Sequence, residues 1–407
     1  MDSQVLIPHL FRTEYSKIVA VLCRRIGMEN VALAEDIASD TFATALYTWP
    51  YKGIPENPPA WLYAVAKNKA RNYLSRETIF REKVSEQLLQ TADEMLWPDI
   101  NQVDAEINDN QLQMMFAICH PTLPPEAQTG LALRLLCGFG IDEIANAFLI
   151  SRETVNKRLF RAREKLRNEN ISLDFPDAHE LPARLDSVLA TLYLLFSEGY
   201  YSESDDTIIR EDLCEDAMRL TYLLTKNANT AKPEVYALLA LMSFHTSRFA
   251  ARINGNGDVV LYDDQDESLW NRELIAKGAE LLAKSATGSR LTRYHLEATI
   301  AYWHTRKDNT PEKWENILNL YDTLLEIAYS PVAALNRIYA LAKVKGEAAA
   351  ITAAEALHLE ENPYHYTLLG ELYRNTDKNK SRTFLEKALS YARTQKDRST
   401  IIRKIEA

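Results

Sequence analysis

Seven arginine and lysine residues lie within the sixteen residues from Arg152 to Arg167, against two glutamates, so this stretch has a net charge of +5. Basic side chains pair with phosphate oxygens, and arginine and asparagine can also make paired hydrogen bonds to the edge of a base. Between them, an apolar set recurs at helical spacing: Val155, Leu159, Ala162 and Leu166. The stretch therefore predicts a helix with one buried face and one outward face suited to nucleic acid.

A shorter helical pattern, Ile141 to Phe148, comes directly before this helix, and Ser151 is a good N-cap for the helix itself. The two helices and the tight corner at Leu149 and Ile150 predict a helix-turn-helix, whose second helix enters the major groove of DNA. Taken alone, an ordinary amphipathic helix with a solvated basic face would explain the same pattern. The residues expected to point outward are Arg152, Glu153, Asn156, Lys157, Arg161 and Arg163.

Two more helices are predicted upstream. The first runs from Ala34 to Trp49 and is followed by a turn-rich loop; the second begins after Asn57, which can cap it with Pro58 at its first position. On the first helix, Ile37, Phe42, Ala45 and Leu46 are expected inward and Glu35, Asp36 and Asp40 outward. On the second, Trp61, Leu62, Val65, Ala66 and Tyr73 are expected inward and Lys67, Asn68, Arg71 and Arg76 outward. A basic face beside the loop aromatics Trp49 and Tyr51 suits single-stranded nucleic acid.

The motifs AEDIASDTF, AWLYAVAKNKARNYLSR and LPPEAQTGLALRLLCGFGIDEIANAFLISRETVNKRLFRAREKLR occur in one order along the first two-fifths of the chain. In order and spacing they resemble regions two and four of sigma-70 superfamily initiation factors of the extracytoplasmic-function type. Later motifs, ELPARLDSVLATLYLLFSEGYYSE, DLCEDAMRL and SPVAALNRIYAL, are similar to the long TPR-like carboxy-terminal extension of one subgroup. Three ordered motifs are more specific than a lone helix-turn-helix.

The resemblance implies three sets of contacts, with RNA polymerase core and promoter DNA as partners. The polymerase clamp would meet the helix that carries Asp36, Ser39 and Asp40, although serine stands at position 39 where many members have glutamine. The −10 element would meet the loop from Tyr51 to Asn57 and the following helix, at Tyr51, Lys52, Asn57, Lys67, Asn68 and Arg71. The −35 element would meet Arg152, Glu153, Asn156, Lys157, Arg158 and Arg161.

Composition limits the remaining possibilities. A chain of 407 residues is long for one domain, and its four scattered cysteines form no CxxC pair, so they favour buried apolar roles over a disulfide framework or a zinc site. The sequence has neither a signal-like amino terminus nor an apolar run that spans a bilayer, so we expect a cytoplasmic protein without membrane contact. The formal net charge of −10 is unusual for a protein that binds DNA unaided.

Four segments are expected: 1–76 (region two), 77–112 (an acidic linker of net charge −7), 113–170 (region four) and 171–407 (the extension). The linker is either simply solvated or threads a basic polymerase channel. The extension is rich in helical patterns, and near its end Leu335, Tyr339 and Ala354 recur 34 residues later as Leu369, Tyr373 and Ala388. This period fits tetratricopeptide helix pairs, so the predicted fold is all-α throughout.

The extension offers weak signals for other chemistry. His245, Arg248 and Arg252 share a helical face, and an acidic turn follows at 263–267, which favours an interhelical ion-pair network over a catalytic or metal site. Asn-Gly turn signals predict a short hairpin around 254–260. No catalysis, cofactor or metal is therefore expected.

The preferred interpretation is an alternative sigma factor with a fused regulatory extension. Whether that extension contacts a small regulatory protein or the sigma domains of its own chain, through Leu181 to Tyr201, stays open. One alternative is a dimeric helix-turn-helix regulator that senses a ligand through its helical repeats, but such a regulator has no use for the block from Ala34 to Arg76. Another is a repeat-domain adaptor that has lost DNA binding, which the basic face after Arg152 argues against.

Overall fold

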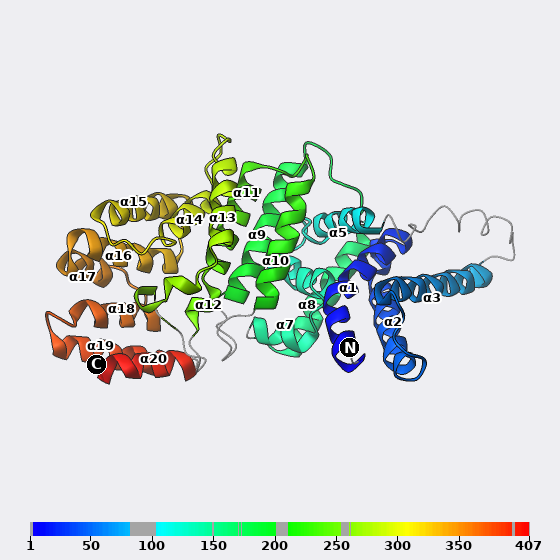
Figure 1. The fold of residues 1–407 in the computed structure, drawn as a ribbon, viewed down its shortest axis with the longest axis horizontal. Coiled ribbons are helices and arrows are strands. Elements are labelled where there is room, and N and C mark those ends of the chain that lie inside the picture. Colours follow the sequence, from blue (N-terminus) through cyan, green and yellow to red (C-terminus); the bar gives the residue numbers. More distant parts are fainter. Residues whose placement is uncertain are drawn as a thin grey trace. The chain divides into compact units, whose positions relative to one another are not determined.

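A computed structural model of the chain describes residues 3–81, 103–148, 150–169, 171, 173–200, 211–253, 260, 262–392 and 395–406. These residues form helices and connecting turns with no β-strand, as the all-α prediction requires (Figure 1). The chain divides into two compact units, Met1–Leu195 and Phe196–Ala407. Among the described residues, no helix is both long and apolar enough to cross a membrane.

The first unit begins with three long helices, α1 (Ser3–Ile26), α2 (Val31–Lys52) and α3 (Pro58–Arg81), with the short η1 (Met28–Asn30) between the first two. Their core forms around Tyr15, which stacks on Phe11 with ring centroids 4.7 Å apart, while Phe11 also meets Phe42 of α2 edge-on. The expected cap of α3 is confirmed, because the Ala60 amide donates to Asn57 Oδ1 at 3.1 Å.

A second group of helices in the same unit comprises α5 (Val103–Ile118), α6 (Pro125–Leu131), the π-helical η2 (Ala132–Leu136), α7 (Ile141–Ala147) and α8 (Arg152–Asn168). Helix α5 packs against α1, and α8 packs against α6, α7 and η1, so the two helix groups share one core. Helix α5 takes in the last ten residues of the range expected as a linker, and Asn110, Gln111 and Leu112 are buried there.

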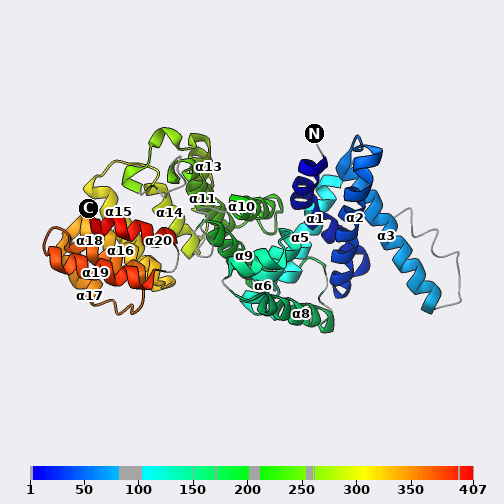
Figure 2. The ribbon, with the colours of Figure 1, turned by 90° about the horizontal axis from the view of Figure 1, so that it is seen from below.

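The long helix α9 (Leu181–Tyr200) starts inside this first unit (Figure 2). Its Arg184 donates to the Phe116 carbonyl of α5 at 3.0 Å, and Thr191 donates to Gln128 Oε1 of α6 at 3.5 Å. A run of leucine and valine on the same helix is at most 2% exposed: Leu185, Val188, Leu189, Leu192 and Leu195. The start of the extension therefore belongs structurally to the segment that precedes it.

The second unit is a succession of helices in which α11 packs mainly on α13 and α14, whereas from α15 onward each helix packs mainly on its neighbours along the chain. They are α10 (Glu211–Lys226), α11 (Pro233–Thr246), α12 (Phe249–Arg252), η3 (Tyr262–Asp264), η4 (Glu267–Leu269), α13 (Arg272–Ser285), α14 (Arg293–Trp303), α15 (Pro311–Ile327), α16 (Pro331–Lys345), α17 (Glu347–Glu355), α18 (Pro363–Tyr373), α19 (Lys378–Tyr391) and α20 (Gln395–Glu406). Helix α11 is almost wholly buried, and Gly278 of α13 allows close approach, since a Cβ there would lie 2.6 Å from the Phe244 ring.

The 34-residue period corresponds to a shared core of successive helix pairs, α16–α17 and α18–α19. Leu335 and Leu369 are both buried, and so are Ala354 and Ala388, each with no exposed surface. The tyrosines of the repeat differ, because Tyr373 is buried whereas Tyr339 is 38% exposed. Stacked helical hairpins with a continuous core are thus present, as the period predicts.

Two smaller predictions have definite outcomes. All four cysteines are free and buried, as expected, and burial raises the pKa of the Cys119 thiol to about 12. The hairpin expected around 254–260 lies almost wholly outside the described residues; at its end, the Val260 amide donates to the Arg252 carbonyl at 2.9 Å.

Candidate nucleic-acid interface

Helix α8 forms as predicted and presents its polar face outward. Ser151 caps it, with Oγ accepting from the Thr154 amide at 3.2 Å, and the apolar set from Val155 to Leu166 is buried. Six residues of the predicted −35 set are exposed: Arg152, Glu153, Asn156, Lys157, Arg158 and Arg161. All six residues are thus accessible on the part of the α8 surface that lies outside its buried stripe.

Three of these six side chains take part in two exposed ion pairs. Arg152 Nε lies 2.7 Å from Asp142 Oδ1 of α7, and Lys157 Nζ lies 2.6 Å from Glu153 Oε1. All four side chains are at least 64% exposed, so each pair contributes little to stability and is easily exchanged for a phosphate. The two ion pairs therefore orient these side chains and leave them accessible to DNA.

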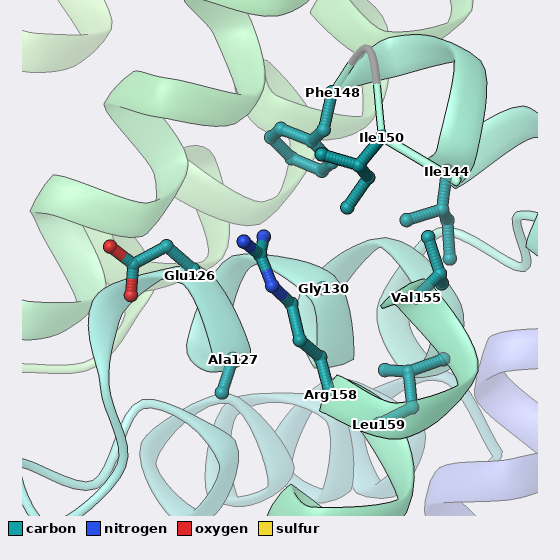
Figure 3. A pocket seen from close by; sticks show the side chains of 9 residues that line it. All are labelled: Glu126, Ala127, Gly130, Ile144, Phe148, Ile150, Val155, Arg158 and Leu159. Atoms are coloured by element: carbon teal, nitrogen blue, oxygen red, sulfur yellow. The ribbon is translucent and has the colours of Figure 1, made fainter. Parts of the chain in front are cut away.

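Arg158 lies differently from the other basic residues of α8. Its side chain enters a small hollow among α6, α7 and α8, where Figure 3 shows the guanidinium group near Phe148, Ile150 and Glu126. The hollow has a volume of about 10 Å³ and is lined mostly by apolar side chains. Arg158 remains exposed, so reading a base from this position requires its side chain to swing out of the hollow.

Arg163 was expected to point outward with the other basic residues, and this expectation is wrong. Its guanidinium instead contacts Glu35 Oε2 of α2, and Arg134 Nε of η2 lies 2.7 Å from the other oxygen of the same carboxylate. Glu35 was also expected outward but is only 5% exposed. Burial by itself would lower the pKa of Arg134, but its interactions with Tyr15 and with the carboxylates of Glu35 and Glu143 together outweigh burial and raise it.

Glu35, Arg134 and Arg163 are called the carboxylate bridge below. The bridge joins α2 of the first helix group to η2 and α8 of the second, across 99 and 128 residues of sequence. A second, more exposed ion pair, Arg24 with Asp174 at 3.1 Å, links α1 to the segment after α8. Sequence spacing carried no signal for either contact, because both depend on the packing of distant helices.

The outward face of α2 carries the residues expected to meet the polymerase. Asp36, Ser39 and Asp40 are exposed, and Asp40 forms an ion pair with Lys69 of α3. Sequence reasoning missed the apolar part of this face. Leu46 was expected inward but is 54% exposed, and Tyr47 next to it is 79% exposed.

The expected −10 residues lie at the end of α2 and along α3. Tyr51 is 90% exposed, and Lys52, Asn68 and Arg71 are exposed as well, while Lys67 is partly buried. Helix α2 continues through Lys52, so the predicted loop is shorter and begins at Gly53, where φ is +83°. A left-handed residue of this kind commonly ends a helix and favours glycine.

Two further residues near this surface, Trp49 and Tyr73, differ from expectation. Trp49 was expected beside Tyr51 in the loop, but it is buried in α2 and meets Trp61 edge-on with ring centroids 5.4 Å apart. Tyr73 was expected inward but is 44% exposed. Asn57 is exposed, but its side-chain oxygen is occupied by the cap of α3. The side chain of Arg76 lies outside the described residues.

The ion-pair network expected around His245 takes another form. Arg248 lies over the rings of Tyr262 and Trp270, with Cζ 5.5 Å and 6.0 Å from the two centroids, and Arg252 Cζ lies 4.0 Å from the Tyr200 ring centroid. His245 belongs to α11, whereas Arg252 belongs to α12, so they share no single helix. Within the described residues, no three His, Cys, Asp or Glu gather closely enough to hold a metal ion.

Comparison with family models places two known regions and one unassigned region along the chain. Residues 10–79 match sigma-70 region 2, and residues 114–166 match sigma-70 region 4. Residues 184–286 match a family of unknown function, DUF6596. The first two matches contain α2 and nearly all of α3 and α8, with the exposed residues described above.

Two relatives illustrate the range of similarity. An uncharacterized protein of Rhizobium meliloti is 34% identical over 369 residues, which cover 89% of this chain and 87% of the relative. A protein of Haemophilus influenzae named ECF RNA polymerase sigma-E factor is 30% identical over 165 residues, 38% of this chain and 82% of the relative. No solved structure matches significantly. With both conserved regions in order and a named relative matched over most of its length, the chain belongs to the sigma-70 family of RNA polymerase sigma factors.

Proposed function

We propose that the chain is an alternative sigma factor of the extracytoplasmic-function type, which binds core RNA polymerase in the cytoplasm and directs it to a class of promoters. The observation that carries the proposal is the exposed face of α8, a capped helix with Arg152, Lys157 and Arg161 outward, in one chain with a region 2 match. The named relative in Haemophilus influenzae supports the same type. No step of this function requires catalysis by the chain itself.

The proposal divides the contacts among three surfaces. Helix α2 meets the polymerase through Asp36, Ser39 and Asp40, and the exposed Leu46 and Tyr47 add apolar area to the same face. Exposed aromatic residues are common at the centres of protein interfaces. The −10 element is met by Tyr51, Lys52, Asn57, Lys67, Asn68 and Arg71, and the −35 element by Arg152, Glu153, Asn156, Lys157, Arg158 and Arg161.

Promoter binding requires the carboxylate bridge to open. The two promoter elements are separated by roughly 25 base pairs, or about 85 Å of B-form DNA at ~3.4 Å per pair. In the structure, Arg163 of the helix assigned to the −35 element contacts Glu35 of α2. Both elements cannot be bound at that separation while this contact persists, so the bridge belongs to a closed state of the free protein.

The extension acts as the regulatory part of the chain in this proposal. Its first helix α9 contacts α5 and α6 within the same compact unit as the sigma regions. Because the extension is covalently attached, even a weak contact competes at a high effective concentration.

The experiment is run-off transcription by core polymerase with three forms of the chain: full length, residues 1–200 and residues 1–170. The form 1–170 lacks α9, and the surface that packs against the leucine and valine face of α9 would become exposed in it. The form 1–200 keeps α9 and therefore tests the rest of the extension without that exposure. We expect promoter-specific transcription from 1–200, altered in level relative to full length. Specific operator binding by the isolated chain, with no transcription in any form, would contradict the sigma assignment and favour the dimeric regulator.

The role of α3 has its own test. Asn68→Ala should impair transcription from a duplex promoter and be rescued on a template already melted at the −10 element. Equal impairment on both templates, with unchanged base preference, would place Asn68 in the stability of α3 rather than in strand opening.

A further inference from the structure

Two buried cations lie together in the second unit. Arg248, at the N-terminal end of α12, is 7% exposed, and Lys313, in the first turn of α15, is 1% exposed. Both approach the same ring, with Arg248 Cζ 5.5 Å and Lys313 Nζ 5.3 Å from the centroid of Tyr262. His304 meets that ring edge-on at 5.1 Å. These residues are contributed by four separate elements of the chain, so the grouping is produced by the tertiary fold.

Neither buried cation forms an ion pair with a carboxylate of the described part of the chain. Lys313 Nζ donates to the Tyr262 hydroxyl at 3.2 Å and to the Arg306 carbonyl, which are both neutral. The acidic groups nearby are engaged elsewhere: Asp308 pairs with Arg306 at 3.1 Å, and Asp263 accepts from the Tyr339 hydroxyl at 3.5 Å. Buried charge without a counter-charge costs free energy, which a native fold ordinarily avoids.

Several hydrogen-bonding atoms of the same region also lack partners. Arg248 Nε and Trp270 Nε1 are buried without an acceptor, and the Nδ1 atoms of His245 and His304 are buried without any partner. Trp270 is 3% exposed and lies 6.0 Å from Arg248 Cζ by its ring centroid. The arginine and tryptophan groups can only donate. Six of the twelve such atoms found among the described residues belong to the stretch from His245 to His304.

Burial and neighbouring charge keep the histidines neutral. Burial, followed by the charges of Arg248 and Lys313, lowers the pKa of His304 to about 3. Burial and the charges of Arg248 and Arg252 likewise lower the pKa of His245 well below its usual value. A neutral imidazole can offer an N–H to an anion without adding a further buried charge.

We propose that Arg248, Trp270 and Lys313, with His304 beside them, form a binding site for a small organic anion that carries a carboxylate or phosphate group. Such a group supplies the missing negative charge and accepts from Arg248 Nε and Trp270 Nε1 at once, and charge-assisted bonds of this kind are the strong ones. The rings of Tyr262 and Trp270 lie against Arg248 and hold its guanidinium group in place. That the anion is the input of a regulatory extension rests on the proposed function; the binding itself does not.

The binding test uses the full-length chain in chloride buffer of constant ionic strength, titrated separately with inorganic phosphate and with succinate. Thermal unfolding and tryptophan fluorescence are both followed, since Trp270 lies at the site. We expect one probe to raise the unfolding temperature of the second unit by about 5 °C near saturation, which also distinguishes phosphate from carboxylate. No shift with either probe overturns the proposal.

Arg248→Met separates binding from structure. It removes an unpaired buried cation, so we expect the unfolding temperature in chloride to hold or rise while the shift with anion disappears. The matched control is Arg272→Met, because Arg272 lies over the same Trp270 ring at 5.8 Å but has a 62% exposed side chain. This variant should keep the shift. A shift that survives in Arg248→Met, together with lower stability in both buffers, means that Arg248 only packs against the rings.

Trp270→Phe provides a second variant that keeps an aromatic ring and removes only the N–H donor. We expect it to weaken anion binding about tenfold, and unchanged affinity would contradict the proposed contact. Neither polymerase nor promoter enters these assays. Failure to bind an anion therefore leaves the sigma assignment intact, and failure of run-off transcription leaves the anion site intact.

Discussion

The two compact units bury arginine in opposite ways. In the first unit, Arg134 and Arg163 both pair with the carboxylate of Glu35, so each arginine has a counter-charge within the chain. In the second, Arg248 and Lys313 are buried against aromatic rings with no carboxylate paired to either among the described residues. The carboxylate bridge therefore stabilises the fold by itself, whereas the buried cations of the second unit lack the counter-charge that the proposed anion would supply.

Exposed basic residues, in contrast to these buried ones, contribute little to the free energy of unfolding. Arg152 and Lys157 on α8 are paired at the surface, where water and salt weaken the interaction. These residues matter through their position on α8, because a DNA phosphate can take the place of the carboxylate in each exposed pair. Changes at the bridge, at α8 and at the buried basic residues should therefore differ in size and in kind.

The largest effect is expected from Glu35→Gln. Removal of the carboxylate leaves Arg134 and Arg163 partly buried without a counter-charge, which should cost about 3–5 kcal/mol of unfolding free energy. Urea unfolding of the first unit, followed by hydrogen exchange at α2 and α8, measures the loss. Asp40→Asn is the control, since its pair with Lys69 is exposed and should cost at most ~1 kcal/mol. Equal losses would mean that the bridge contributes no more than a surface pair.

Arg158→Ala tests the recognition face. If the guanidinium swings from its hollow to a base edge, holoenzyme binding to the −35 element should weaken by about 1–3 kcal/mol and lose preference at one base pair. Arg167→Ala is the control, because Arg167 lies at the far end of α8 and the amino-terminal part of a recognition helix reads bases. A loss that is uniform across all sequences would identify Arg158 as a phosphate contact.

The pH dependence of stability should distinguish the second unit. In the folded chain the pKa of His304 is about 3, while the unfolded chain titrates near ~6.5. Below about pH 6.5 the unfolded state therefore gains a proton that the folded state does not bind, so stability is full above that pH and falls as pH decreases toward 3. His304 by itself contributes at most about 1.4 kcal/mol per pH unit to this slope.

His304→Gln should flatten this slope, as measured by thermal unfolding at pH values between 4 and 7. The exposed His358 provides the control, and His358→Gln should leave the slope as it is. Identical pH profiles for the parent chain and both variants would show that His304 is not buried in neutral form.

The smallest effect is expected at α2. Asp36→Lys should weaken binding to core polymerase by about 1 kcal/mol, and Asp40→Lys by less, because Asp40 must first give up its pair with Lys69. Binding measured at two salt concentrations checks both the size and the electrostatic origin. A larger loss at Asp40 than at Asp36 would contradict the cost assigned to the Lys69 pair.

Much of the local structure was predictable because its causes are local. Ser151 and Asn57 cap α8 and α3 as their sequence positions indicate, and the apolar spacing from Val155 to Leu166 identifies the buried face of α8 correctly. The 34-residue period likewise reflects packing between neighbouring helices, so Leu335 and Leu369 occupy equivalent buried places. Caps and periodicity act within a few residues or a few turns, which a linear pattern records.

The tertiary structure alone decided which faces are covered. Helical spacing shows that Leu46 and Tyr73 can share a face with core residues, but whether another helix lies over them depends on packing, and both are exposed. Glu35 looks like its neighbour Asp36 in sequence, yet it is buried because Arg134 and Arg163 are brought to it from 99 and 128 residues away. Arg248 and Lys313 meet at Tyr262 for the same reason: long-range contacts leave no regular spacing in the chain.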